Sequence, residues 1–206
     1  MSLPLKTIAI ADDEPGIRSV LQTIASDLGY QVVGVAQNGA EAVEVVRQKQ
    51  PQAILLDIHM PVLDGLEATR KIVELGTTAV VLLTADLNPE LAREAMDIGA
   101  CGYMLKPFDS TQIAAILESA WHRLQTVKAL MDKARLMDEA LEMRKLTEKA
   151  KGILMEQQGF TEQQAHQCLQ KMSQDQGIPM KEVCRSVIQV RMVLGKKSQK
   201  TLPQSY

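Results

Sequence analysis

Short apolar segments alternate with amphipathic segments through the first half of the chain. Five runs are almost continuously apolar and predict strands, at residues 7–11, 31–36, 53–57, 79–84 and 102–106. Strands that are apolar along their whole length are buried on both faces, as in a parallel sheet. Between the runs, apolar residues recur at helical spacing near residues 15–28, 39–49, 65–75 and 88–98. This alternation predicts an α/β fold with a doubly wound, five-stranded parallel sheet of flavodoxin-like type.

One long helical pattern begins at Ser110 and continues without a clear break to Gly152. Its apolar residues are spaced alternately by four and three up to Ala134, as in a coiled coil, and the next step breaks the repeat and suggests a local change in supercoiling. We predict a coiled-coil linker helix over residues 113–146 that joins two copies of the chain, with Trp121 packed at its base. The alternative is a single helix packed on its own domain, which the first turns favour. The predicted seam is Ile113, Leu117, Ala120, Leu124, Val127, Met131, Ala134, Met137 and Leu141.

The C-terminal part of the chain predicts a small three-helix bundle. A first helix over residues 147–158 ends at Gly159, a capping box at residues 161–164 opens a second helix, and a third helix ends at Gly195. So few residues bury little core alone, so we expect the bundle to depend on packing against the linker helix. Residues 196–206 are predicted to form a disordered tail. The apolar stripes of the last two helices are Ala165, Cys168, Leu169 and Met172, and then Val183, Val187, Val190 and Leu194.

Composition and charge narrow the class of protein. The 206 residues are 46% hydrophobic and 23% charged, as in a soluble globular protein, and we predict a cytoplasmic location without a membrane partner because there is no long apolar run and no leader-like N-terminus. The three cysteines lack metal-ligand spacing. The net charge of −2 divides into −7 over residues 1–112 and +5 over residues 113–206. An acidic N-terminal half and a basic C-terminal half suggest two tasks, the second involving a polyanion. The alternative is that the basic residues only form a solvated helical surface.

Polar side chains stand where the predicted strands end. Because the carboxyl ends of parallel strands meet at one edge of the sheet, we expect Asp12, Asp13, Asp57, Thr84 and Lys106 to lie close together. A lone Asp at a strand end most often caps a turn, but this convergence argues against that reading. Clustered carboxylates repel one another unless a cation intervenes, and Mg²⁺ prefers oxygen ligands.

Each of these residues has a predicted role. We expect Asp13 and Asp57 to bind Mg²⁺ directly, the backbone carbonyl of His59 to be a third ligand, and Asp12 to act through water. An aspartate can attack phosphorus to give an acyl phosphate. Lys106 would then pair with the phosphoryl oxygens, and the Thr84 hydroxyl would donate to another of them.

Four motifs resemble the signature set of response-regulator receiver domains: ADDE at 11–14, LDIHMPVLDG at 56–65, LTA at 83–85 and GACGYMLKP at 99–107. The resemblance covers about residues 5–120. It implies that Asp57 accepts phosphate from a sensor histidine kinase with Mg²⁺ present, and that Thr84 and Tyr103 form a switch pair. Phosphatases of the haloacid-dehalogenase type need a second Asp two residues after the first, where this chain has His59. We therefore expect no enzyme, only self-directed phosphoryl chemistry at Asp57.

Two further motifs resemble the ANTAR module of transcription antitermination regulators: AKGILM at 150–155 and GFTEQQA at 159–165. The resemblance covers roughly residues 140–195 and implies binding to paired RNA hairpins in leader transcripts. His166, Gln170 and Cys184 depart from the family pattern. For packing, we predict Ala150, Gly152, Ala165 and Leu169. For RNA contact, where phosphates need exposed cations and loop bases need stacking partners, we predict Lys149, Lys151, Lys171, Lys181, Arg185, Arg191 and His166.

Together these patterns predict a two-component response regulator that works as a dimer and promotes antitermination through RNA. Two alternatives remain open at the level of sequence. In one, the C-terminal helices dock a protein partner and no longer bind RNA. In the other they form a DNA-binding helix-turn-helix, although no short turn leads into a helix rich in Arg, Asn and Gln.

Overall fold

A five-stranded parallel sheet forms the first part of the protein. A computed structural model describes residues 5–86 and 88–198, with only the backbone for residues 192–198. The strand order is β2-β1-β3-β4-β5, with all pairs parallel, which confirms the predicted fold class. The last strand ends one residue earlier than predicted, so Lys106 lies just beyond it. The strands are β1 (Thr7–Ala11), β2 (Gln31–Ala36), β3 (Ala53–Asp57), β4 (Ala79–Thr84) and β5 (Gly102–Leu105).

Four helices connect the strands, as predicted. They are α1 (Pro15–Asp27), α2 (Gly39–Lys49), α3 (Gly65–Leu75) and α4 (Pro89–Asp97). Local chemistry fixes where they begin: the side chains of Asn38, Asp64 and Asn88 accept hydrogen bonds from backbone N–H groups in the first turns of α2, α3 and α4. Each helix that follows a strand therefore starts close to the carboxyl end of the sheet.

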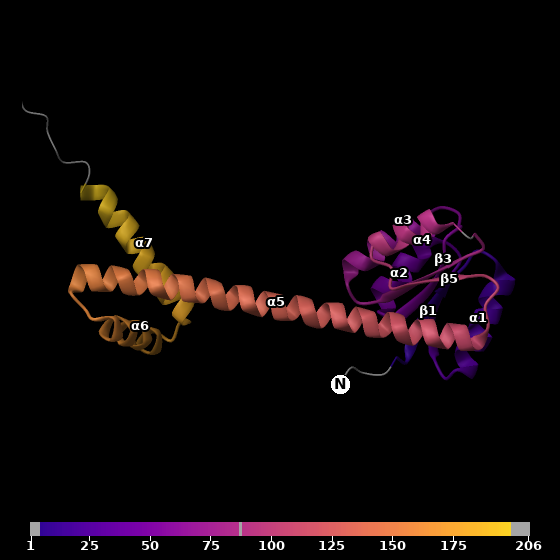
Figure 1. The fold of residues 1–206 in the computed structure, drawn as a ribbon, viewed down its shortest axis with the longest axis horizontal. Coiled ribbons are helices and arrows are strands. Elements are labelled where there is room, and N and C mark those ends of the chain that lie inside the picture. The colour runs from indigo at the N-terminus through magenta and orange to yellow at the C-terminus, as the bar shows by residue number, and fades with distance from the viewer. Residues whose placement is uncertain (1–4, 87, 199–206) are drawn as a thin grey trace, which may run out of the picture. The chain divides into compact units, whose positions relative to one another are not determined.

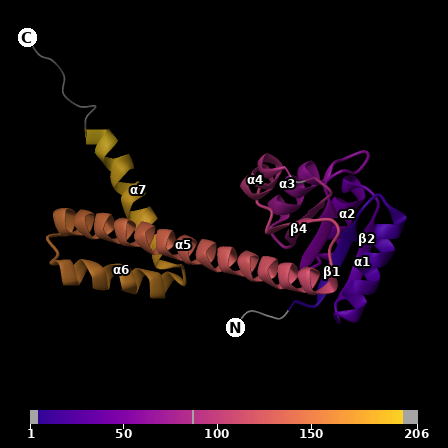
Figure 2. The ribbon, with the colours of Figure 1, turned by 45° about the vertical axis from the view of Figure 1, so that its right-hand side comes forward.

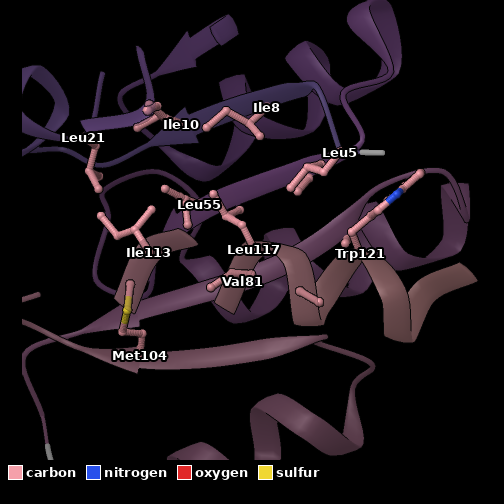
Figure 3. Packing of buried hydrophobic residues seen from close by; sticks show 14 of the residues in the cluster. Leu5, Ile8, Ile10, Leu21, Leu55, Val81, Met104, Ile113, Leu117 and Trp121 are labelled. Atoms are coloured by element: carbon pink, nitrogen blue, oxygen red, sulfur yellow. The ribbon is translucent and has the colours of Figure 1, made fainter. Parts of the chain in front are cut away.

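Helices cover both faces of the sheet (Figure 1), and an apolar core lies between the sheet and the helices on each face. On one face, α1 and the start of α5 (Ser110–Gln158) pack on the strands through residues such as Leu21, Ile113 and Leu117 (Figure 3). On the other face, α2, α3 and α4 contribute residues such as Val46 and Ile72. Strands buried on both sides explain the continuous apolar runs of the sequence.

The long helix α5 begins at Ser110 as predicted and runs unbroken through Gly152 to Gln158. Ile113, Leu117 and Ala120 are buried in the α/β core together with Trp121, which confirms the alternative of a helix packed on its own domain for these turns. Further along, the apolar seam residues are exposed, among them Val127, Met131, Met137 and Leu141. The coiled coil stays a prediction.

The chain forms two compact units, Met1–Leu130 (the α/β unit) and Met131–Tyr206 (the helical unit). In the helical unit, α6 (Glu162–Gln176) and α7 (Met180–Ser198) lie on different sides of the end of α5 (Figure 2). Their shared core consists of Ala150, Ile153, Leu169, Val183, Cys184 and Ile188. The predicted capping box of α6 is present, with Thr161 and Gln164 bonded reciprocally. Within the described residues, no helix is both long and apolar enough to cross a membrane.

Two predictions about α7 are wrong. The predicted stripe is wrong at Val190, which is 56% exposed. Val183 and Val187 do pack on the core, where Cys184 and Ile188 join them. The helix also continues through Gly195 to Ser198 instead of ending there. The side chain of Leu194 lies outside the described residues, and so does the predicted disordered tail, apart from residues 196–198, which belong to α7.

Candidate functional site

Three carboxylates meet at the carboxyl end of the sheet. Asp12 follows β1 and is fully buried, Asp57 ends β3 with 5% of its surface exposed, and Asp13 is exposed beside them. One oxygen atom from each lies within 4.8 Å of the others. The three carboxylates that strand-end geometry predicted to converge therefore do so.

Lys106 connects the two buried acids. Its Nζ lies 2.7 Å from Asp12 Oδ2 and 2.7 Å from Asp57 Oδ1. Burial raises the pKa of Asp57, and the hydrogen bond and charge of Lys106 offset this only in part. Burial also lowers the pKa of Lys106, but its hydrogen bonds to Asp12 and Asp57 outweigh that effect, so the net pKa is raised. At neutral pH Lys106 is thus a fixed cation between the carboxylates.

This donor set fits a hard divalent cation. One ammonium against three carboxylates leaves an excess of negative charge in a partly buried site, and carboxylate oxygens are the ligands that Mg²⁺ prefers. Exposed Asp13 leaves the cluster open to water on one side, as an ion that keeps part of its hydration shell requires. His59 lies two residues beyond Asp57 with its side chain exposed.

Backbone packing holds the site in shape. A Cβ atom on Gly65 would lie 2.2 Å from the backbone oxygen of Asp57 and 2.8 Å from Ile58 Cα, so the start of α3 can approach β3 only with glycine there. On the other side, Arg18 of α1 donates from one guanidinium nitrogen to the carbonyls of Asp12 and Asp13, at 2.6 and 2.9 Å. Both loops that carry the acids are thereby fixed.

Thr84 and Tyr103 are linked through a single residue. The buried Thr84 hydroxyl accepts a hydrogen bond from the backbone N–H of Asp86, at 3.0 Å. The half-buried Tyr103 donates its hydroxyl proton to the backbone oxygen of the same residue, at 3.1 Å. A change in the position of Thr84 would therefore reach Tyr103 through one loop residue.

In the helical unit, most of the predicted RNA-contacting cations are paired with glutamates. Lys151 is buried and bonded to Glu148 and Glu162, at 2.8 and 2.6 Å. Glu142 of α5 accepts from both Lys181 and Arg185 of α7, at 2.8 and 3.1 Å. Arg185 also pairs with Glu182, at 3.2 Å, and Arg191 pairs with Glu156, at 2.8 Å.

The other predicted contacts differ from these. Lys149, Lys171 and His166 are exposed, and the two lysines make no ion pair within the described part of the chain. Lys151 does not offer the exposed cation that phosphate attraction needs, because it fastens the start of α6 to α5 instead. Of the residues predicted to pack, Ala150, Ala165 and Leu169 are buried, but Gly152 is exposed, so that prediction is wrong for Gly152.

Comparison with known proteins agrees with both units. The family model of the response regulator receiver domain matches residues 8–118, more than half of the chain, and the model of the ANTAR domain matches residues 135–188. The chain belongs to the response regulators. The order of its domains is that of a phosphorylation-controlled regulator with an RNA-binding antitermination output.

Individual relatives cover the receiver or the whole response regulator. The transcriptional regulatory protein PdtaR of Mycobacterium tuberculosis is 35% identical over 184 residues, 89% of this chain and 90% of that protein. The chemotaxis protein CheY of Thermotoga maritima is 31% identical over 54% of this chain and 94% of that one. Among solved structures, CheY4 of Vibrio cholerae superimposes with a TM-score of 0.53 at 27% identity, covering 57% of this response regulator and 99% of that chain.

Sequence reasoning missed several residues of the response regulator that the structure brings into play. Arg18 acts through its guanidinium on backbone carbonyls, and Asp86 acts through its own backbone, so neither gives a signal in spacing or residue type. The glutamates that hold the ANTAR cations, such as Glu142 and Glu156, look in sequence like ordinary residues of a solvated helix. Only the packing of the three helices identifies them.

Proposed function

We propose that this response regulator accepts a phosphoryl group on Asp57 from a sensor histidine kinase and, when phosphorylated, binds RNA hairpins in leader transcripts so that transcription continues past a terminator. The observation that carries the proposal is the convergence of Asp12, Asp13, Asp57 and Lys106 at the end of the sheet, in a chain that also has an ANTAR domain.

The proposed chemistry is one displacement at phosphorus. A carboxylate oxygen of Asp57 attacks the phosphohistidine of the kinase, a P–O bond forms, and the P–N bond breaks to return the imidazole. Asp12, Asp13, Asp57 and the His59 carbonyl would hold Mg²⁺, which neutralises phosphoryl charge when bound. Lys106 would turn from the carboxylate of Asp57 to the new phosphoryl oxygens. Phosphoryl transfer and hydrolysis are thus self-directed, and we expect no separate substrate to be turned over.

The switch step uses the link through Asp86. The phosphoryl group adds a charge of about −1.5 to −2 and three acceptor oxygens next to Asp57. Thr84, which now accepts from Asp86, would donate its hydroxyl proton to one of these oxygens and move toward it. The loop at Asp86 would follow, and Tyr103 would lose its present acceptor and turn inward. The surface formed by β5 and the neighbouring helices then changes.

We propose a homodimer as the RNA-binding form. Exposed apolar residues on α5, including Val127, Met131 and Leu141, continue the spacing of a two-stranded coiled coil. Two linked ANTAR domains would bind a two-hairpin RNA as one ligand, which strengthens two weak contacts. Moving the equilibrium from about 1:99 to 99:1 requires about 5.5 kcal/mol of differential stabilisation, which phosphoryl contacts and association must supply together.

For RNA contact the proposal starts from Lys149, Lys171 and His166, which are exposed. Lys181, Arg185 and Arg191 would join them by exchanging a glutamate for a phosphate. Exposed ion pairs contribute little free energy, so this exchange meets a small barrier. Lys151 is left out because it is buried between two glutamates.

The test is RNA binding with and without phosphorylation. A labelled two-hairpin RNA is selected by the phosphorylated protein from a pool with randomised loops, and its affinity is measured before and after treatment with a small phosphodonor and Mg²⁺. We expect the treatment to tighten binding for the wild type and for Asp27→Asn, an exposed aspartate of α1, but not for Asp57→Asn. Equal binding by treated wild type and by Asp57→Asn would refute the coupling, and specific binding to duplex DNA alone would refute the RNA output.

A further inference from the structure

Gly152 occupies a position where none of the described residues requires glycine. It lies inside α5, six residues before the helix ends, and its surface is exposed. A Cβ atom built there would meet no heavy atom within 4 Å. Glycine inside a helix is unfavourable compared with alanine, because the backbone loses more freedom on folding. Close approach by another molecule would account for it.

The residues around Gly152 point to a polyanion as that molecule. Residues three, four and seven positions away share one face of a helix, and here these are Lys145, Glu148, Lys149, Met155 and Glu156, all exposed. Both glutamates are engaged by cations away from this face. Both lysines make no ion pair among the residues that the structure describes. The face therefore presents two free positive charges beside uncovered backbone.

A second copy of this chain fits the same face poorly. Continuing the seven-residue repeat from Val127 and Ala134 leads to Leu141, Glu148 and Met155, and from Met131 it leads to Asp138, Lys145 and Gly152. Charged residues would thus fill three of the four inner positions from 138 to 148, with Leu141 as the exception, which disfavours a coiled coil beyond that residue. The apolar seam of α5 therefore ends before it reaches Gly152.

We propose that this face of α5, formed by Lys145, Lys149, Gly152 and Met155, is where an unpaired RNA loop lies against the ANTAR domain. The two lysines contact loop phosphates, and Gly152 lets a nucleotide rest on the helix backbone with the 40% exposed Met155 beside it. This inference rests on the proposed RNA-binding function and names the surface that performs it.

The experiment compares the full-length, phosphodonor-treated wild type with Gly152→Ala, Gly152→Gln and Lys149→Gln. The probe is the labelled two-hairpin RNA selected by the wild type, titrated over a salt series. We expect Gly152→Ala to weaken binding about tenfold, as insertion of extra atoms into a close contact does, and Gly152→Gln to weaken it further. We expect neither to change the salt dependence. Lys149→Gln should reduce the slope of log affinity against log salt by about one.

Two controls separate contact with RNA from damage to the fold. Both Gly152 variants should raise the thermal midpoint of the helical unit, since alanine and glutamine favour helix more than glycine does. Gln163→Ala, at the exposed start of α6, should leave RNA affinity within about twofold of the wild type. A substitution that stabilises the protein but weakens RNA binding can act only at the contact.

Three results would count against the inference. If Gly152→Gln binds the selected RNA as tightly as the wild type, the backbone of α5 is not a contact surface. If the Gly152 variants lose RNA only in proportion to a loss of dimer, measured by mass, the face belongs to a second copy. If the wild type selects no RNA from the pool, the proposed function fails first, and the inference fails with it before any variant is compared.

Discussion

Charged side chains are organised differently in the receiver domain and in the ANTAR domain. In the receiver, two buried carboxylates, Asp12 and Asp57, share one ammonium, so removing Lys106 leaves both carboxylates without this partner. In the ANTAR domain, Glu142 and Glu156 lie on the surface and hold cations that could bind other anions equally well. Burial turns charges into an interdependent site, whereas exposure leaves them exchangeable. This contrast matches a phosphoacceptor at one place and a polyanion surface at the other.

The largest expected effect on stability comes from replacing Gly65 of the receiver, and glycines elsewhere in the chain provide the comparison. Gly65→Ala places a methyl group against the backbone of Asp57, and we expect it to lower the free energy of unfolding by about 3 kcal/mol and to slow phosphorylation. Gly16→Ala, also near the start of a helix beside the site but with open space around it, is the matched control and should not destabilise the protein. Gly152→Ala should instead stabilise the ANTAR domain by about 1 kcal/mol. Urea unfolding measures all three, and equal effects at Gly65 and Gly16 would contradict the proposed packing.

Removing Lys106 tests whether the receiver charges depend on one another. Breaking a buried ion pair typically costs about 3–5 kcal/mol, and because Lys106 is 14% exposed we expect about 2 kcal/mol for Lys106→Met. Millimolar Mg²⁺ should restore part of this loss by neutralising the same carboxylates. Lys71→Met removes an exposed lysine of α3 and should change stability little. If the two variants unfold alike, with and without Mg²⁺, the carboxylates are not held by Lys106.

The pH dependence of stability follows from the raised pKa of Asp57. A group that binds its proton more tightly in the folded protein opposes folding when it is ionised, and this opposition disappears as pH falls through the raised pKa. Asp57→Asn should therefore be more stable than the wild type at neutral pH, and the difference should narrow on acidification. Asp27→Asn reports the effect of losing an exposed charge. If Asp57→Asn instead gained stability relative to the wild type as the pH falls, the effect of Lys106 on the pKa of Asp57 would outweigh the effect of burial.

The smallest effect is expected at Glu142, the exposed partner of two cations. Hydrogen bonds from Lys181 and then the charges of Lys181 and Arg185 lower the pKa of Glu142, so it is ionised at neutral pH. Glu142→Gln should release Lys181 and leave Arg185 paired only with Glu182, so RNA binding should tighten about threefold at low salt, with stability nearly unchanged. The control is Glu139→Gln, which removes the same charge from the same helix. Glu139 makes no ion pair among the described residues. An equal gain in RNA affinity in both variants would mean that the change in net charge alone causes it.

What the sequence predicted well was set by short-range pattern and by one topological rule. Continuous apolar runs fixed the strands, and a parallel sheet brings strand ends together, so Asp57 and Lys106 could be placed side by side without coordinates. The ANTAR surface had no such rule. Whether Lys151 is buried and Gly152 exposed depends on which side of α5 the other helices cover, and the same holds for Ile188 and Val190 of α7, of which only Ile188 lies in the core.

The measurement that tests the central claim most directly is intact-mass spectrometry of the protein after brief treatment with a small phosphodonor, followed by location of the adduct. The account predicts one phosphoryl adduct per chain, dependent on a divalent cation, situated on Asp57 and absent from Asp57→Asn. No adduct in the presence of Mg²⁺, or an adduct on another residue, would contradict it.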